Sequence, residues 1–207
     1  MKLDSIIFDL DGTLWDSVDS IKVSWNNVIQ ANNQIREDLT REDLEGVMGL
    51  QMDDIAKKLF PALEDEVRSK ILNECFEVEN TYIEKHGGIP YKNVENVLKE
   101  LSKKYKLFIV SNCQEGYIEA FYKYHGLEQY FNDFENPGRT GLSKGENIQL
   151  IIKRNQLSSP VYVGDTDGDL KAARFAGIPF VYAKYGFGEV SEYDEVIEEF
   201  EDLLKLY

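Results

Sequence analysis

A short apolar run that ends in two aspartates constrains the fold of this chain more than any other feature. Ile6, Ile7 and Phe8 predict a buried β-strand, and Asp9 and Asp11 follow it. Residues two apart in an extended backbone point the same way, so we expect both carboxylates on one face at the carboxyl end of the strand. Carboxylates buried together repel each other and lose hydration, and the pair therefore predicts a cation beside it.

Gly12 and Thr13 come next and predict the end of that strand. Glycine lets the backbone approach a ligand closely, and threonine adds a hydroxyl and an amide that both donate hydrogen bonds. The alternative interpretation is a polar turn with two solvated aspartates. The other polar clusters of the chain distinguish between a cation site and a solvated turn.

A second acidic cluster follows the apolar run 161–163. Asp165, Asp167 and Asp169 lie within Gly-Asp-Thr-Asp-Gly-Asp, where a strand is expected to end and a helix to begin. Acids cap helix N-termini well, which explains one or two of the three. Together with the pair after the first strand, they favour a hard cation with oxygen ligands. Mg²⁺ suits carboxylates, waters and a substrate phosphate.

Polar residues at two further places complete the candidate site. Ser111 and Asn112 follow the apolar run 107–110, and Lys144 begins a predicted helix over 144–155. Open parallel sheets bind ligands at the carboxyl ends of their strands, where a hydroxyl and an amide can hold phosphate oxygens. A lysine misfits the dipole at a helix N-terminus, which supports a role facing an anion. As alternatives, Ser-Asn is common in turns and most lysines are solvated.

The order of the predicted elements indicates the fold class. Residues 16–86 carry helical spacings only, and Gly87-Gly88-Ile89-Pro90 is the clearest break in the chain. Beyond it helices and strands alternate, with an edge strand expected over 130–134 and an acidic helix over 191–204. This alternation predicts a parallel sheet with helices on both faces. We therefore predict an α/β fold, a Rossmann-like three-layer α/β/α core with an all-helical insertion after its first strand.

Composition and charge limit the partners. The 207 residues carry 38 acidic and 23 basic side chains, a formal net charge of −15, which disfavours nucleic acid and anionic membranes. No apolar run could cross a bilayer, and no signal-peptide core precedes the first strand. Cys75 and Cys113 fit a reduced compartment, and His86 and His125 are too scattered for a histidine metal site. We expect a cytoplasmic monomer or homodimer.

The motifs, taken in order, resemble those of a known family. Asp-Leu-Asp-Gly-Thr at 9–13, Ser111-Asn112, Lys144 and Gly-Asp-Thr-Asp-Gly-Asp at 164–169 are similar to the four motifs of the haloacid dehalogenase-like (HAD) superfamily of hydrolases. The first and last motifs are specific, whereas the middle two are weak alone. The resemblance implies a Mg²⁺-dependent phosphatase that hydrolyses a small phosphorylated metabolite through an aspartyl-phosphate.

A subgroup can also be named. The run Lys-Ala-Ala-Arg-Phe-Ala-Gly-Ile-Pro at 171–179 and the helical insert look like those of phosphoglycolate phosphatases and β-phosphoglucomutases. This resemblance implies a substrate of the phosphoglycolate or sugar phosphate type. It also implies a core domain of residues 1–15 and 88–207 and a helical cap domain of residues 16–87.

The resemblance implies a role for each matching position. Asp9 would be the nucleophile and a metal ligand, and Asp11 the general acid and base with its main-chain carbonyl on the metal. Asp165 would bind the metal, and Asp169 would bind it indirectly or orient Lys144, which acts in catalysis. The phosphoryl oxygens would be held by Gly12, Thr13, Ser111, Asn112 and Lys144.

The insert is expected to contact the leaving group. Trp15, Met48, Gln51 and Met52 are the candidates, and their largely apolar character suggests a small or partly apolar group.

Alternative activities remain open at this point. A sugar-phosphate mutase is disfavoured because Ile21 stands where a histidine is expected and the loop 46–52 lacks a basic residue. A dehalogenase fits Asp11 and Thr13 poorly. A phosphonate-cleaving enzyme would need a marked cap lysine, and neither Lys57 nor Lys58 is marked.

One non-enzymatic alternative remains, a phosphoacceptor module of the receiver type. Such modules also use an aspartate, Mg²⁺ and a lysine, but they are shorter and carry no helical insert.

Overall fold

A six-stranded parallel sheet forms the centre of the computed structural model, which describes residues 3–32, 35 and 37–207. The strand order is β5-β4-β1-β6-β7-β8. The first strand, β1, lies inside the sheet, where Ile6 faces Leu107 of β4 and Val161 of β6 in parallel register. The strands are β1 (Ser5–Phe8), β4 (Lys106–Val110), β5 (Asp133–Glu135), β6 (Pro160–Gly164), β7 (Phe180–Ala183) and β8 (Glu195–Ile197).

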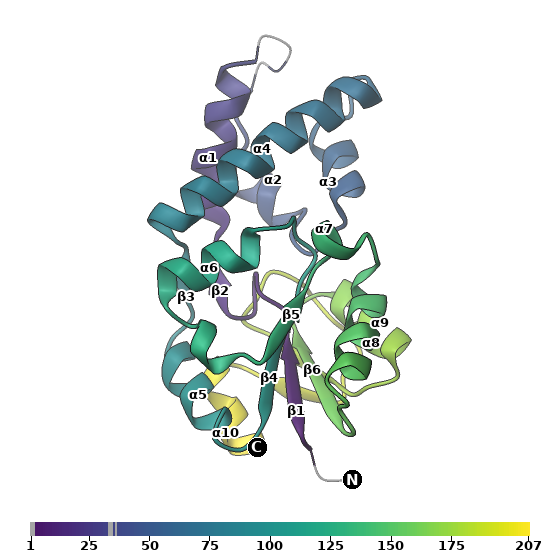
Figure 1. Cartoon of the computed structure of the whole chain (residues 1–207). Helices are drawn as coiled ribbons and strands as arrows, with labels where there is room; N and C mark the ends of the chain where they lie inside the picture. Colours follow the sequence, from purple (N-terminus) through teal and green to yellow (C-terminus); the bar gives the residue numbers. More distant parts are fainter. Residues whose placement is uncertain (1–2, 33–34, 36) are drawn as a thin grey trace.

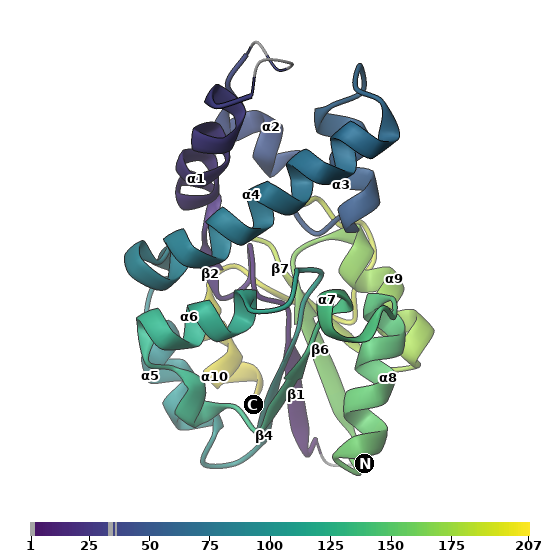
Figure 2. The ribbon, with the colours of Figure 1, turned by 45° about the horizontal axis from the view of Figure 1, so that its top comes forward.

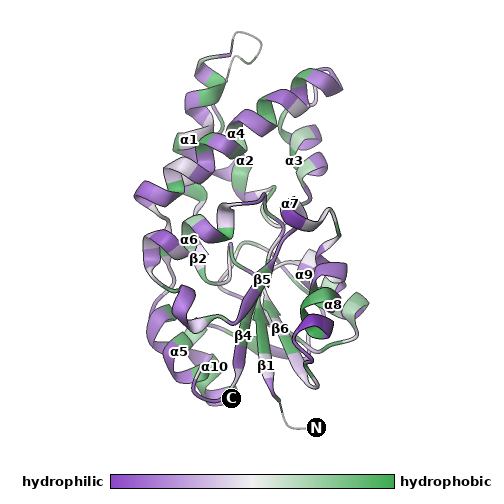
Figure 3. Ribbon diagram, viewed as in Figure 1, coloured by the Kyte–Doolittle hydropathy of each residue, from purple (hydrophilic) through white to green (hydrophobic). Residues whose placement is uncertain are grey.

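Alternate strand residues build two separate apolar layers. On β1, Ile6 and Phe8 belong to one buried cluster, and Ile7 belongs to the other on the opposite face. The strands β4, β6 and β7 alternate in the same way. Such strands read as continuous apolar runs because both faces of the sheet are covered. In Figure 3 the inner strands are hydrophobic over most of their length, whereas the helices carry hydrophilic and hydrophobic stretches side by side.

Helices cover both faces of this sheet, as predicted (Figure 1). One face packs against α8 and α9, and the other against α5, α6 and the carboxyl-terminal segment, where Phe200 stacks on Phe8 with ring centroids 5.8 Å apart. The three-layer α/β/α prediction is therefore confirmed. The core helices are α5 (Val94–Leu101), α6 (Tyr117–His125), η1 (Glu128–Tyr130), α7 (Pro137–Thr140), α8 (Lys144–Arg154), α9 (Asp167–Ala176), η2 (Phe200–Asp202) and α10 (Leu203–Leu206).

Four helices from the insertion lie together above the carboxyl ends of the strands (Figure 2). They are α1 (Val18–Gln30), α2 (Arg41–Glu45), α3 (Met52–Leu59) and α4 (Asp65–His86). The prediction of one helix over 16–33 is met by α1, although Asn33 lies outside the described residues. The boundaries of the predicted cap domain, 16–87, stay a prediction. Within the described residues, no helix combines the length and apolar character needed to cross a bilayer.

A short ladder joins this group of helices to the sheet. The strand β2 (Trp15–Asp16) leads into α1, and β3 (Ile89–Pro90) leads out of α4. The two strands pair antiparallel, Trp15 with Pro90 and Asp16 with Ile89. The expectation that 16–86 holds no strand is therefore wrong by one residue, Asp16.

The predicted helix over 191–204 is wrong. This segment holds β8, η2 and α10, and its three apolar residues with helical spacing are shared among them. Val181 and Ala183 of β7 pair with Glu195 and Ile197, and the backbone of Asp194 donates to Phe180 O at 3.0 Å. The edge of β7 offers hydrogen bonds that outweigh the local helical pattern. The edge strand predicted over 130–134 exists, but it begins at Asp133.

Candidate active site

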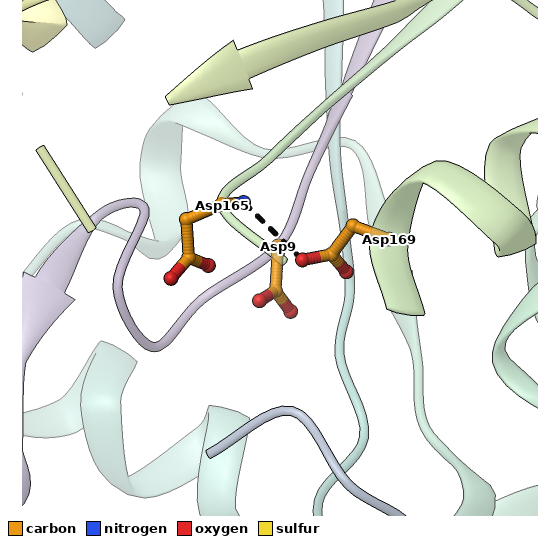
Figure 4. Close-up of side chains that lie close together, drawn as sticks. All are labelled: Asp9, Asp165 and Asp169. Carbon is orange, nitrogen blue, oxygen red and sulfur yellow. Dashed lines mark hydrogen bonds between the residues drawn. The ribbon is translucent and has the colours of Figure 1, made fainter. Parts of the chain in front are cut away.

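Three buried carboxylates meet at the carboxyl edge of the sheet (Figure 4). Asp9 follows β1, Asp165 follows the neighbouring strand β6, and Asp169 stands in the first turn of α9. One carboxylate oxygen from each lies within 4.8 Å of the other two. Parallel neighbours end at the same edge, so residues separated by more than 150 positions in sequence become neighbours here.

Lys144 is the cation of this cluster. Its Nζ donates to Asp9 Oδ1 at 2.9 Å and to Asp169 Oδ1 at 2.6 Å, and the residue is only 4% exposed. Lys144 is the first residue of α8, and its side chain extends to the sheet edge. The preceding residue, Ser143, caps the helix. Lys144 is therefore buried at the site and is not the solvated lysine of the alternative interpretation.

One ammonium balances only one of the three carboxylates. Buried charges without partners are unfavourable, so the arrangement favours a further, divalent cation. The ligand atoms on offer are all carboxylate oxygens, which suits Mg²⁺ better than softer metals. Burial and the negative charge of Asp169 raise the pKa of Asp9 to about 7, and burial also raises the pKa of Asp165.

Asp169 serves both α9 and Lys144. Its Oδ2 accepts from Thr166 N (2.9 Å) and Thr166 Oγ1 (2.7 Å), which completes a capping box, while Oδ1 receives Lys144. Asp169 therefore takes part in capping α9, as the alternative expected, and it also contacts Lys144; its role in the reaction stays a prediction. Asp167, the middle acid of the motif, is exposed and pairs with Lys171 instead.

Asp11 points away from the three-carboxylate cluster into a set of hydrogen-bond donors. Its Oδ1 accepts from Trp15 Nε1 (2.9 Å), Ser17 Oγ (2.5 Å) and Tyr117 OH (2.8 Å). Burial raises the pKa of Asp11, and these three bonds oppose the rise. Ser17 and Tyr117 were not among the predicted site residues. Ser17 lies four residues after the first motif and could have been suspected, but nothing in the sequence marks Tyr117.

Gly12 and Thr13 lie against Asp165. Gly12 has a φ of +78°, and a Cβ there would overlap the Asp165 carboxylate, so only glycine fits. Thr13 Oγ1 donates to Asp165 Oδ1 at 3.4 Å, and the backbone of Phe187 donates to Oδ2 at 2.8 Å. The loop after β7 thus supports Asp165, a contribution that the motif search missed.

Ser111 and Asn112 stand at the end of β4, beside β1. Ser111 is buried, and its backbone nitrogen donates to Glu135 O of the next strand at 3.3 Å. Asn112 reaches the opposite way, and its Nδ2 donates to Gly49 O in the loop before α3 at 2.9 Å. Asn112 Oδ1 is buried without a hydrogen-bond partner. Both residues therefore occupy the sheet edge at which they were predicted.

A cavity of about 50 Å³ lies between Asp11 and the four upper helices. Met48 and Met52 line it, as do Asn112 and Tyr117. Gln51 lines a neighbouring hollow that also touches Met52 and Asn112. Trp15 lies apart from this cavity, fully buried against Phe121 with ring centroids 4.9 Å apart, and its predicted contact with a leaving group has no counterpart in the lining. Its place is behind Asp11, as a hydrogen-bond donor.

Comparison with known proteins decides the family. The profile of the haloacid dehalogenase-like hydrolases matches residues 6–183, which is most of the chain. The chain belongs to this family.

Among curated relatives of this HAD-like hydrolase, the phosphoglycolate phosphatase of Vibrio vulnificus (strain CMCP6) is 28% identical over 219 residues, covering 96% of this chain and 93% of the relative. That of Aquifex aeolicus is 26% identical over 215 residues, with 97% and 95% covered. CbbY from Rhodobacter sphaeroides, solved in complex with phosphate, shares the fold with a TM-score of 0.80 at 16% identity, with 98% and 96% covered. The predicted family and enzyme, a phosphatase of this family, are confirmed.

Proposed function

We propose that this phosphatase is Mg²⁺-dependent and hydrolyses a small phosphorylated metabolite through an aspartyl-phosphate on Asp9. The observation that carries the proposal is the meeting of Asp9, Lys144 and two further carboxylates at one buried sheet edge. Phosphoryl transfer needs mainly alignment and neutralisation of charge, and these groups supply both.

Asp9 and Asp11 carry out the two chemical steps of the proposed reaction. Asp9 attacks phosphorus, the bond to the leaving oxygen breaks, and Asp11 gives that oxygen a proton. Burial raises the pKa of Asp11 and so favours the protonated form that can donate. In the second step Asp11 takes a proton from the water that attacks the acylphosphate. Asp9 becomes free again and inorganic phosphate is released.

The remaining residues of the site bind the phosphoryl group and the metal ion in this proposal. Lys144, Ser111 and Asn112 would hold the phosphoryl oxygens together with Gly12 and Thr13, and the contacts of Lys144 with Asp9 and of Thr13 with Asp165 support this arrangement. Asp9 and Asp165 would hold Mg²⁺ together with the main-chain carbonyl of Asp11, while Asp169 holds Lys144. When bound, the ion neutralises negative charge on the phosphoryl oxygens.

The helical cap, residues 16–87, covers this edge and in our proposal shields the reaction from water. The curated relatives carry the name phosphoglycolate phosphatase, which makes a two-carbon phosphate ester the first substrate to consider. A mutase gains no support, because Ile21, where a histidine would be expected, is 5% exposed and lines the apolar cavity.

The direct test is the variant Asp9→Asn, assayed with p-nitrophenyl phosphate and Mg²⁺. We expect loss of all measurable turnover. Asp167→Asn is the matched control, because Asp167 lies in the same acidic motif region but is exposed, and it should keep wild-type rates. Turnover that persists in Asp9→Asn would contradict the nucleophile assignment. A long-lived phospho-Asp9 without release of phosphate would favour the phosphoacceptor module.

A further inference from the structure

The wall of the cavity beside Asp11 carries a buried acid that the reaction does not use. Glu79 on α4 is 3% exposed and lines the cavity together with Asp11. Its Oε2 accepts a hydrogen bond of 2.5 Å from Trp25 Nε1, which fixes the carboxyl group in place. Glu79 faces the proposed position of the leaving group from the cap side.

The same wall has no cation. Among the described residues that line the cavity, none is lysine, arginine or histidine. Lys144 is engaged by Asp9 and Asp169 and is not part of this lining. A carboxylate or a second phosphate on the leaving group would therefore be buried without a counter-charge, near two carboxyl groups, which is strongly unfavourable.

The wall of the cavity holds a buried hydrogen-bond acceptor without a partner. Asn112 Oδ1 is buried without a partner, and Glu79 and Asp11 add carboxyl oxygens. Each side-chain donor of the wall makes at least one hydrogen bond: Trp25 Nε1 with Glu79, Tyr117 OH with Asp11, Gln114 Nε2 with Asn80 and Asn112 Nδ2 with Gly49. A ligand that brings its own donor satisfies Asn112 Oδ1, and one that brings only acceptors leaves this oxygen unpaired.

We propose that Glu79 is a specificity-determining residue that selects phosphate esters of small alcohols whose far end carries a hydrogen-bond donor, a hydroxyl or an ammonium, and no negative charge. This inference rests on the proposed phosphatase function and narrows its substrate class. It places phosphoglycolate, which bears a carboxylate, among the poor substrates, although the curated relatives are named for it. The cavity of about 50 Å³ admits only a leaving group of a few heavy atoms while the cap stays closed.

Four esters of nearly equal size test the inference: 2-hydroxyethyl phosphate, phosphoethanolamine, n-propyl phosphate and phosphoglycolate. We expect kcat/KM for the better of the two donor-bearing esters to exceed that for phosphoglycolate by at least about tenfold, with propyl phosphate in between. A rate for phosphoglycolate equal to or above those of the donor-bearing esters would overturn the inference. Equal rates for propyl and hydroxyethyl phosphate would overturn its donor part.

The variant Glu79→Gln keeps the shape of the side chain and an oxygen for Trp25. We expect it to lower the preference for donor-bearing esters over phosphoglycolate by about fivefold or more. Glu77→Gln, the same change on the exposed side of α4, is the matched control and should leave the preference as in the wild type. An unchanged preference in Glu79→Gln would remove this residue from specificity.

A failure of this specificity inference can be distinguished from a failure of the proposed phosphatase function. Wild-type hydrolysis of any of these esters, or of p-nitrophenyl phosphate, that is absent in Asp9→Asn upholds the phosphatase mechanism whatever the order of substrates. If the wild type hydrolyses neither these four esters nor p-nitrophenyl phosphate in the presence of Mg²⁺, the proposed phosphatase mechanism fails.

Discussion

The sheet edge and the cap-side cavity are two halves of one site with opposite electrostatic character. At the edge, Lys144 lies between two carboxylates, and the geometry leaves a place for a divalent cation. In the cavity, Glu79 and Asp11 stand among apolar side chains, and no described residue of the lining is a cation. The difference supports our proposal that the sheet edge binds the anionic phosphoryl group. The cavity would then discriminate among leaving groups by their hydrogen bonds and charge.

The largest expected effect comes from removing the cation of the sheet edge. In Lys144→Ala, two of the three buried carboxylates lose their ammonium partner, and we expect kcat/KM to fall by about 10²–10³-fold. The free energy of unfolding should also fall, by about 3 kcal/mol in metal-free buffer, as when one partner of a buried ion pair is deleted. Steady-state kinetics and urea titration measure the two effects. Lys171→Ala, which breaks an exposed pair at 2.6 Å on α9, should change neither.

The second prediction concerns Glu79, the acid of the cavity, and its effect on the free energy of unfolding. Burial raises the pKa of Glu79 from 4.5 to about 8, so the folded protein keeps this proton where the unfolded chain loses it. Glu79 therefore favours folding most below pH 4.5, and its contribution declines as the pH rises to about 8. Between pH 5 and pH 7 the stability of the wild type should fall relative to Glu79→Gln by about 3 kcal/mol, at about 1.4 kcal/mol per unit. Urea unfolding of both proteins across this range measures the difference, and a constant difference would show that Glu79 titrates normally.

The third effect tests the proposed metal at the edge. A ligand that binds only the folded state stabilises it, by about 2.7 kcal/mol at a hundred times its Kd. We expect Mg²⁺ to raise the urea midpoint of the wild type and to have little effect on Asp165→Asn. Asp167→Asn should respond as the wild type does, because its side chain lies outside the cluster. Equal responses of the two variants would contradict a site formed by Asp165.

The smallest effect concerns Asp11, which lies between the two halves. Tyr117→Phe removes one hydrogen bond that lowers the pKa of Asp11, so this pKa should rise further. The alkaline limb of the kcat/KM profile, where Asp11 has to be protonated, should then move to higher pH. Tyr122→Phe is the matched control on α6, because the Tyr122 hydroxyl is buried without a partner. A shift of the limb in the control alone would argue against the role of Tyr117.

The sheet edge was predictable from the sequence, as were Met48 and Met52 of the cavity, but the buried acid of the cavity was not. Asp9, Lys144, Asp165 and Asp169 follow strands or begin helices, and the topology of a parallel sheet brings such positions to one edge. Glu79 gives no such signal, because it is one acid among many on a long helix. Its burial depends on where α4 lies relative to α1 and the sheet.

The failed helix over 191–204 has a related cause. Its apolar residues have helical spacing, but pairing with the edge of β7 determines the structure of this segment. The sequence of the segment alone gives no information about that edge. The fold class survived this error because the inner strands β1, β4 and β6 carry unambiguous apolar runs.

The small ladder between β2 and β3 has a mechanical consequence. The chain enters and leaves the upper helices through these two strands, and they are bonded to each other. The two covalent links between α1–α4 and the core therefore run through this ladder, while α4 also packs against α6. We expect any opening of the helical cap to bend the chain at these two strands and to separate Asn112 Nδ2 from Gly49 O, so that the alcohol product can leave.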